Sequence, residues 1–357
     1  MKRNGKTSSG RTRWRCKRCG ASTTQEYSDE AKWLRRFVGW LLGKRTQAEL
    51  DVGARNFRKH TSAFWGIWPI LPICDEVHHV VYMDGLWLAR ECVILIACSD
   101  EHVIGCHLAK SENSKDWSYL MRRIAAPDVL VCDGGGGIAK AMRAAWPRTK
   151  MQRCAFHAFR QVRRCTTTRP KTQAGCDIYA LARDLMRIES NTEAAIWMAR
   201  FQKWCADHED FLKERNDTGR YVHERLRKAR RSLIKLCNAG TLFTYLAEDL
   251  AKDGPIPSTS NRIENLNGQI RRMLSLHRGM NIDHRIKAVF WFCYMKSDAP
   301  MPFARMLHDF PTDDDIGEWR RRAARANGGD SGTPARWGDG IMWSELHHSI
   351  PYPYKTD

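Results

Sequence analysis

The sequence predicts an α/β protein that is built on a mixed sheet and interrupted by an all-helical insertion. Three short runs rich in β-branched residues begin at about residue 77 and are separated by turn-length gaps, a pattern typical of an antiparallel meander. Helical and strand patterns alternate after them, as in α/β folds. Residues 165–256 then show helical patterns with many Arg and Lys and few strand signals, so we expect them to form the insertion.

The predicted sheet elements follow one another in a defined order. The meander strands are HVVYMDGLWL, ECVILIACSD and HVIGCHLAK, and the next strands are DVLVCD and a run near 150–154. We expect helices at about 115–124 and 138–146, and a glycine turn at 134–137. Hairpin strands followed by alternating helix and strand form the order of ribonuclease-H-like folds. The core would then comprise a first part, residues 76–164, and final helices, residues 257–305, of which a helix from about 261 to 276 is the strongest.

The region before the core, residues 29–70, resembles a helix-turn-helix. Helical patterns cover Glu30–Leu42, Thr46–Asp51 and Ala54–Trp65, with breaks at glycines between them. The third helix carries three cations that we expect to enter a major groove: Arg55, Arg58 and Lys59. An ordinary three-helix packing unit with solvated charges is the alternative.

The first 28 residues form a basic arm that contains Cys16-x-x-Cys19, the shape of one knuckle of a zinc ribbon. A structural zinc ion takes four ligands, and no second such pair follows at ribbon spacing. Either the matching pair lay upstream of Met1 or the two thiols bind no metal. At the other end, residues 306–357 are rich in Gly, Pro and Trp, and we expect an irregular tail.

The charge of the chain indicates a nucleic-acid partner. It has 59 Lys and Arg against 40 Asp and Glu, a net charge of +19, and a pI near 9.6. Residues 1–60 alone hold 16 basic and 5 acidic residues, so this end is the expected DNA-docking region. A structural RNA-binding protein would explain the charge equally well.

The cysteines and the apolar runs predict where the protein works. Thirteen cysteines, most of them single residues inside apolar runs, fit free thiols in a reducing compartment better than disulfides. No apolar stretch approaches the roughly 18 residues of a membrane span. We therefore expect a cytoplasmic, nucleoid-associated bacterial protein with no membrane partner.

Two aspartates lie where metal ligands are expected in a mixed sheet. Asp84 is expected at the end of the first strand, in VVYMDG, and Asp133 ends the strand DVLVCD before the glycine turn. Both therefore project from the same edge of the sheet. An Asp before Gly is often only a turn former, but burying two carboxylates in apolar runs is costly unless a cation compensates.

Glu264 lies on the predicted helix 261–276, away from its apolar stripe. Asn261 and Glu264 have capping-box spacing, so a purely capping role for Glu264 is the alternative. The same helix carries three arginines that we expect to neutralise DNA phosphates: Arg262, Arg271 and Arg272. In the insertion, Trp197 and Trp204 are candidates for stacking on an unpaired base, although aromatics at this helical spacing also suit a core.

Three motifs in order resemble the bacterial Mutator-like insertion-sequence transposases. They are VYMDG, then VLVCDGGGGIAKAMRAAWPRTKMQRCAFHAFRQV, then STSNRIENLNGQIR, and the similarity covers about residues 77–300. The spacings, 49 residues from Asp84 to Asp133 and 131 from Asp133 to Glu264, suit a sheet-local pair followed by an inserted helical domain.

The resemblance implies a metal-dependent DNA transposase with an acidic triad of Asp84, Asp133 and Glu264. Such a triad holds two Mg²⁺ or Mn²⁺ ions for cleavage at element ends and for strand transfer into target DNA. The partners implied are double-stranded DNA, as terminal inverted repeats and as target, and a second copy of the chain in a homodimer.

The resemblance also marks Cys154 and His157 as a Cys-x-x-His element beside the active site. It would contact the DNA end or bind zinc, in the second case together with Cys16 and Cys19. Two other functions remain open: a non-catalytic DNA-binding protein from a truncated transposase, and a simple metal-dependent nuclease on the same fold. Strand transfer distinguishes the nuclease from a transposase.

Overall fold

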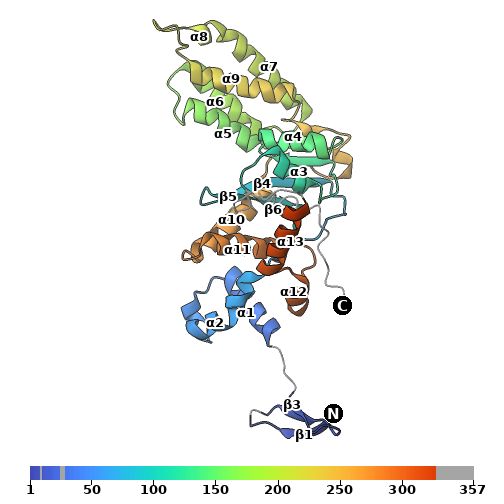
Figure 1. Ribbon diagram of the computed structural model, residues 1–357. Coiled ribbons are helices and arrows are strands. Elements are labelled where there is room, and N and C mark those ends of the chain that lie inside the picture. Colours follow the sequence, from blue (N-terminus) through green and yellow to red (C-terminus); the bar gives the residue numbers. More distant parts are fainter. Residues whose placement is uncertain (9, 25–28, 327–357) are drawn as a thin grey trace.

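A five-stranded mixed sheet lies at the centre of the protein (Figure 1). The computed structural model describes residues 1–8, 10–24 and 29–326. The strand order is β6-β5-β4-β7-β8; β4, β5 and β6 are antiparallel, and β7 and β8 run parallel to β4. The predicted meander and mixed sheet are confirmed. The strand bounds are β4 Val80–Leu88, β5 Cys92–Cys98, β6 Val103–Ala109, β7 Val129–Cys132 and β8 Lys150–Arg153.

Helices cover both faces of this sheet. Side chains alternate along β4, so Val81 and Met83 pack on one face while Val80 and Tyr82 pack on the other. The first face is covered by α3 (Ser114–Met121) and α4 (Gly136–Ala145). The second is covered by α10 (Asn261–Leu276) and α11 (Ile282–Met295), and the predicted bounds of α10 agree with the structure.

The helices between β8 and α10 form a bundle with its own core (Figure 1). Trp197, Phe201 and Trp204 stack inside it, and the bundle begins at Ala155, directly after β8, rather than at residue 165. Its elements are α5 Ala155–Thr166, α6 Gln173–Asp184, α7 Asn191–Asp207, α8 Glu209–Lys213, α9 Glu224–Asn238 and the 3₁₀ turns η3 Leu185–Arg187, η4 Thr244–Leu246 and η5 Ala251–Asp253.

The N-terminal helices share the core of α10 and α11. Phe37 on α1 (Glu30–Leu42) lies 6.4 Å, ring centre to ring centre, from Trp291 on α11. The segment predicted as the middle helix of a helix-turn-helix is only a 3₁₀ turn, η1 (Gln47–Glu49), in which the Glu49 carboxylate accepts a hydrogen bond from the Thr46 amide. The third helix, α2 (Ala54–Thr61), ends four residues early and continues as η2 (Ser62–Gly66).

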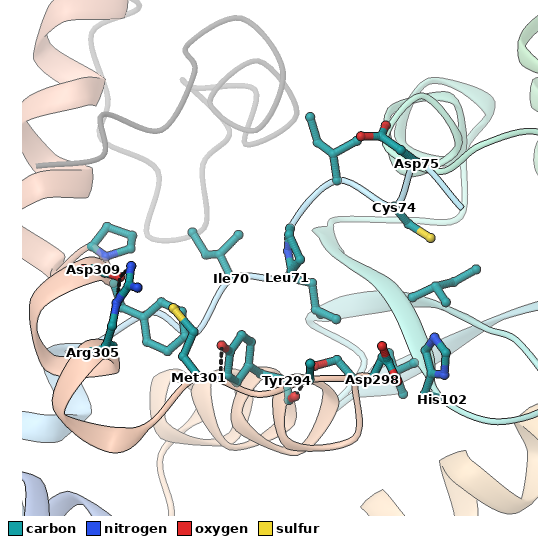
Figure 2. A pocket seen from close by; sticks show the side chains of 18 of the residues that line it. Ile70, Leu71, Cys74, Asp75, His102, Tyr294, Asp298, Met301, Arg305 and Asp309 are labelled. Carbon is teal, nitrogen blue, oxygen red and sulfur yellow. Dashed lines mark hydrogen bonds and ion pairs between the residues drawn. The ribbon is translucent and has the colours of Figure 1, made fainter. Parts of the chain in front are cut away.

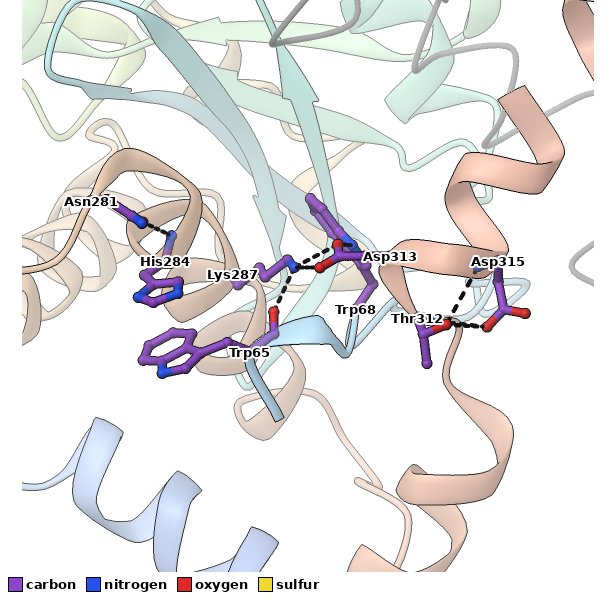
Figure 3. A network of polar contacts seen from close by, with 8 residues as sticks. All are labelled: Trp65, Trp68, Asn281, His284, Lys287, Thr312, Asp313 and Asp315. Carbon is purple, nitrogen blue, oxygen red and sulfur yellow. Dashed lines mark hydrogen bonds and ion pairs between the residues drawn. The ribbon is translucent and has the colours of Figure 1, made fainter. Parts of the chain in front are cut away.

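The prediction of an irregular tail is wrong for residues 306–326. They contain the end of α12 (Phe303–Asp309) and all of α13 (Asp313–Ala326), while residues 327–357 lie outside the described part. Figure 3 shows what fixes α13. The buried ammonium of Lys287 lies 2.6 Å and 2.7 Å from the two carboxylate oxygens of Asp313, and it also donates to the carbonyl of Trp65.

The N-terminal arm is a separate three-stranded antiparallel sheet. Cys16 and Cys19 lie in the connection between its second and third strands, where the Cys16 amide donates to the Ala21 carbonyl. The strands are β1 Lys2–Lys6, β2 Thr12–Arg15 and β3 Ser22–Thr24. Over the described ranges, no helix combines the length and the apolar character needed to cross a membrane.

Candidate active site

Strand register places Asp84 and Asp133 side by side. The last paired residues of the parallel strands β4 and β7 are Met83 and Cys132, and each aspartate is the next residue along its strand. Met83 and Cys132 point to the α3–α4 face, so by alternation the aspartates point to the face that α10 covers. Asp84 does not end its strand as predicted, because β4 runs on to Leu88 in pairing with β5.

Helix α10 brings Glu264 to the same end of the sheet. Asn267, one helical turn after Glu264, donates from Nδ2 to Oδ2 of Asp84 across 2.8 Å. Glu264 Oε1 accepts a hydrogen bond from the Ser260 hydroxyl at 3.0 Å. No Asn261–Glu264 bond occurs, and Glu264 is half-buried rather than a solvent-exposed cap.

Burial and like charge distinguish Asp84 from an ordinary strand residue. Burial, reinforced by the charges of Asp133 and Glu112, raises its pKa to about 6, although the Gly85 amide opposes the shift. The pKa of Glu112 is itself raised, chiefly by burial. Carboxylates held this close in a partly desolvated place are compatible with a hard divalent cation, which prefers oxygen ligands. The side-chain amide oxygen of Asn267, Oδ1, is fully buried and has no hydrogen-bond partner within the described residues, so it is a further oxygen ligand available at this place.

Glu112 is a residue that the sequence did not single out. Trp87 Nε1 donates to its Oε1 at 2.6 Å. Two glycines make room for it: a Cβ on Gly85 would stand 2.7 Å from the Glu112 carboxylate, and one on Gly137 would overlap the Glu112 carbonyl oxygen. The only sequence signal was the pair of glycines, each of which reads as a turn.

The glycine turn fixes Asp133. Gly134 has φ +70, and a Cβ there would stand 2.5 Å from the guanidinium of Arg153, so both backbone and space require glycine. The amide of Gly135 then donates to Oδ1 of Asp133 at 2.9 Å. The turn leads directly into α4, and Asp133 lines a cavity together with Arg153 of β8 and His157 of α5.

The Cys-x-x-His element joins the start of α5 to the start of α10. The Ser260 amide donates to Cys154 Sγ at 3.3 Å, and His157 Nδ1 lies 3.5 Å from Glu264 Oε1. Interaction with the Cys154 thiol raises the pKa of His157, against burial and with help from the Glu264 charge. Burial raises the pKa of Cys154, but its hydrogen bonds to His157 and Ser260 outweigh burial and lower it.

The possible ligand atoms of Cys154, His157 and Glu264 lie within 4.8 Å of one another. Within the described ranges, no such three-ligand group contains Cys16 or Cys19, nor does one join Asp84, Asp133 and Glu264. The expected joint Cys₃His site is therefore not formed in this structure. The three carboxylates share one end of the sheet without making a closed ligand cluster.

Other predicted DNA contacts have mixed outcomes. Stacking of Trp197 and Trp204 on a base is wrong: both are buried, and their indole N–H groups donate to the carbonyls of Leu181 and Ala174. The guanidinium of Arg262 is bound within the protein, since it donates to the carbonyls of Ser99 and Glu101. The remaining predicted cations are exposed, on α2 and on α10: Arg55, Arg58, Lys59, Arg271 and Arg272.

Among the cavities of the described residues, one lies at the predicted site and another lies away from it. One of about 480 Å³ lies beside Asp133 and His157 and is lined by cations of α5 and α9. Another of about 550 Å³ lies between residues 70–76, the start of β6 and the helices α11 to α13. Figure 2 shows its wall, with Ile70, Leu71 and Met301 beside Tyr294. None of the predicted site residues lines this second cavity.

Comparison with known proteins adds to this geometry. The profile described as "Transposase, Mutator family" matches residues 73–280, which contain Asp84, Asp133 and Glu264. The chain belongs to the Mutator family of transposases.

Curated relatives of this family member are transposases of insertion sequences. A transposase for insertion sequence element IS406 from Burkholderia multivorans is 29% identical over 46% of this chain and 43% of its own length. A transposase for insertion sequence element IS905 from Lactococcus lactis is 29% identical over 24% of this chain and 26% of its own length. A probable insertion-sequence transposase from Corynebacterium diphtheriae is 24% identical over 25% and 31%. Each match thus spans less than half of the relative.

Proposed function

We propose that this protein is a DNA transposase that cuts insertion-sequence ends and joins them to target DNA, with Asp84, Asp133 and Glu264 as ligands of two divalent cations. One observation carries the proposal: the register of β4 and β7 sets Asp84 beside Asp133, and α10 crosses the same end with Asn267 bonded to Asp84. Family membership supports the DNA substrate.

The strand order supports a ribonuclease-H-like core. Three antiparallel strands, with two parallel strands beside the first of them, agree with the order expected from the sequence. The helical bundle between β8 and α10 takes the place of the predicted insertion. His157, at the start of the bundle, lies within reach of the charges of both Asp133 and Glu264.

The residues have separable roles in this proposal. Bound Mg²⁺ or Mn²⁺ would supply activation of the attacking oxygen and stabilisation of the leaving oxygen of the phosphodiester. Asp84, Asp133 and Glu264 would hold the cations. Asn267 orients Asp84, the Gly135 amide orients Asp133, and Ser260 with His157 orients Glu264.

DNA recognition outside the catalytic centre is part of the same proposal. Arg55, Arg58 and Lys59 are exposed on α2, which supports contact with element ends. The Cys16–Cys19 turn joins two strands, as in a zinc knuckle, which supports a role in DNA docking. The homodimer stays a prediction, which light scattering of the purified protein checks.

The experiment uses duplex DNA carrying the ends of the element that encodes this chain. In Mg²⁺, we expect Asp84→Asn and Glu264→Gln each to lower the cleavage rate about a thousandfold or more, because metal catalysis contributes several kcal/mol. Glu248→Gln, at an exposed glutamate that takes no part in the contacts of the proposed site, is the matched control. Undiminished cleavage by the first two variants contradicts the assignment. Cleavage by the wild type without joining to target DNA would indicate a nuclease.

A further inference from the structure

A cavity of about 480 Å³ opens beside Asp133 and carries an excess of positive charge. Its walls come from the glycine turn before α4, from α5 and from α9, so the helical bundle supplies most of it. Four cations face it: Arg153, Arg160, Arg164 and Lys235. Asp133 is its only carboxylate, and apart from the His157 imidazole it has no aromatic side chain.

Arg153 is held in this cavity with an unused donor. It is only 9% exposed, and its Nε is buried without a hydrogen-bond partner. One Nη donates to Gln161 at 3.3 Å, and the guanidinium packs against Gly134. A buried donor without a partner costs about 1–3 kcal/mol, so a ligand with acceptor oxygens would relieve that cost.

The other three cations are exposed, and no ion pair to a carboxylate occurs for any of them in the described part of the chain. Their neighbours on α9 differ, because Arg230 pairs with Glu209 and Arg231 with Glu224. Three cations that have no carboxylate partner in the described part of the chain therefore line this one cavity together. The first turn of α4 adds the positive end of a helix dipole to the same wall.

We propose that this cavity binds a backbone phosphate of the DNA strand that is cut, next to the scissile bond. The inference rests on the proposed function, which puts that bond at Asp133. A phosphodiester suits the site because Arg guanidinium groups bind its oxygens in a bidentate manner. A base suits it less, because bases bind by stacking on aromatic rings. The bundle thereby holds the strand in line with the carboxylates.

The test measures DNA binding without divalent metal, so that catalysis does not enter. A fluorescein-labelled duplex carrying an element end is titrated across a series of salt concentrations. Arg160→Ala, Arg164→Ala and Lys235→Ala should each reduce the slope of log K against log salt by about 1, the loss of one phosphate contact. The matched control is Arg163→Ala, at an exposed arginine of α5 that does not line the cavity. Slopes equal to that of the control overturn the proposal.

A second measurement locates the phosphate. In a series of duplexes, one phosphate at a time around the cleavage site is replaced by an uncharged methylphosphonate linkage. For the wild type, we expect the affinity for DNA to fall when one or two adjacent phosphates are neutralised in this way. For Arg164→Ala, we expect neutralisation of the same phosphates to cause no further loss of affinity. Losses that add at every linkage overturn the proposal.

These outcomes separate the cavity from the catalytic assignment. If the cavity variants behave like Arg163→Ala while Asp84→Asn abolishes cleavage, only the phosphate proposal fails. If Asp84→Asn still cleaves DNA, the proposed function fails, whatever the salt slopes show.

Discussion

Asn267 on α10 donates a hydrogen bond to Asp84 on β4 across 2.8 Å, although 183 residues separate them in the chain. Asn267 is fully buried. This bond attaches the helix that carries Glu264 to the strand that carries the first aspartate, so it sets the distance between two of the three carboxylates.

Replacing Asn267 by alanine should therefore disturb both the fold and the site. We expect a loss of about 1–3 kcal/mol in the free energy of unfolding, because a buried hydrogen bond is removed, and a fall in the cleavage rate in Mg²⁺. Asn265→Ala, at an exposed position of the same helix, should change neither. Urea denaturation and cleavage assays check the pair, and equal behaviour of the two variants would contradict a positioning role.

The raised pKa of Asp84 predicts a pH dependence of stability in metal-free buffer. Its pKa in the folded protein, about 6, lies above the ordinary value of 3.8. Between these values the folded state keeps a proton that the unfolded state has lost, so stability falls as pH rises from about 4 to about 6 and is then constant. Asp84→Asn should remove this fall and exceed wild-type stability above pH 6 by up to about 3 kcal/mol. Parallel pH profiles of the two proteins in urea would refute the assignment.

Divalent cations should offset the loss of stability that comes from ionising the buried Asp84 carboxylate. A ligand that binds only the folded state stabilises it by about 2.7 kcal/mol at a hundred times its Kd. We expect Mn²⁺ to raise the Tm of the wild type and of Glu248→Gln, and to have little effect on Asp84→Asn or Asp133→Asn. Differential scanning fluorimetry with and without Mn²⁺ measures this. An undiminished shift in both aspartate variants would place the cation elsewhere.

The Lys287–Asp313 pair should contribute to stability away from the active site. Asp313→Asn leaves the buried ammonium of Lys287 with less compensation, and because Asp313 itself is partly exposed we expect a loss of about 1–3 kcal/mol. Asp314→Asn, at the exposed neighbour, is the control. Chemical denaturation that gives the two variants the same free energy of unfolding would show that α13 is held by its apolar contacts alone.

Much of this site could be predicted from the sequence because its signals are local. The alternating run around Asp84 and the strand before Asp133 predicted a shared sheet edge, and the 261–276 pattern predicted α10. What was missed depends on contacts between distant segments. Glu112 enters the site only because Gly85 and Gly137 leave room for it. Trp197 is core because its indole donates to the Leu181 carbonyl on α6 and packs against Phe243.

The predicted helix-turn-helix was wrong in its middle helix, although the signal for that helix was local. The run Thr46–Asp51 predicted a short helix, but the segment makes only one 3₁₀ turn before Gly53 redirects the chain at φ +70. Arg153 was overlooked because an arginine at the end of a strand gives no sign of burial. Its position follows from the parallel pairing of β7 with β8.

Binding of divalent cations by Asp84, Asp133 and Glu264 is tested most directly by a crystal structure of the protein soaked or grown with Mn²⁺, with anomalous scattering used to locate the ion. We expect anomalous density ligated by Asp84 and Asp133, with Glu264 at or near a second peak. Density confined to Cys154 and His157, or none beside the two aspartates, would contradict it.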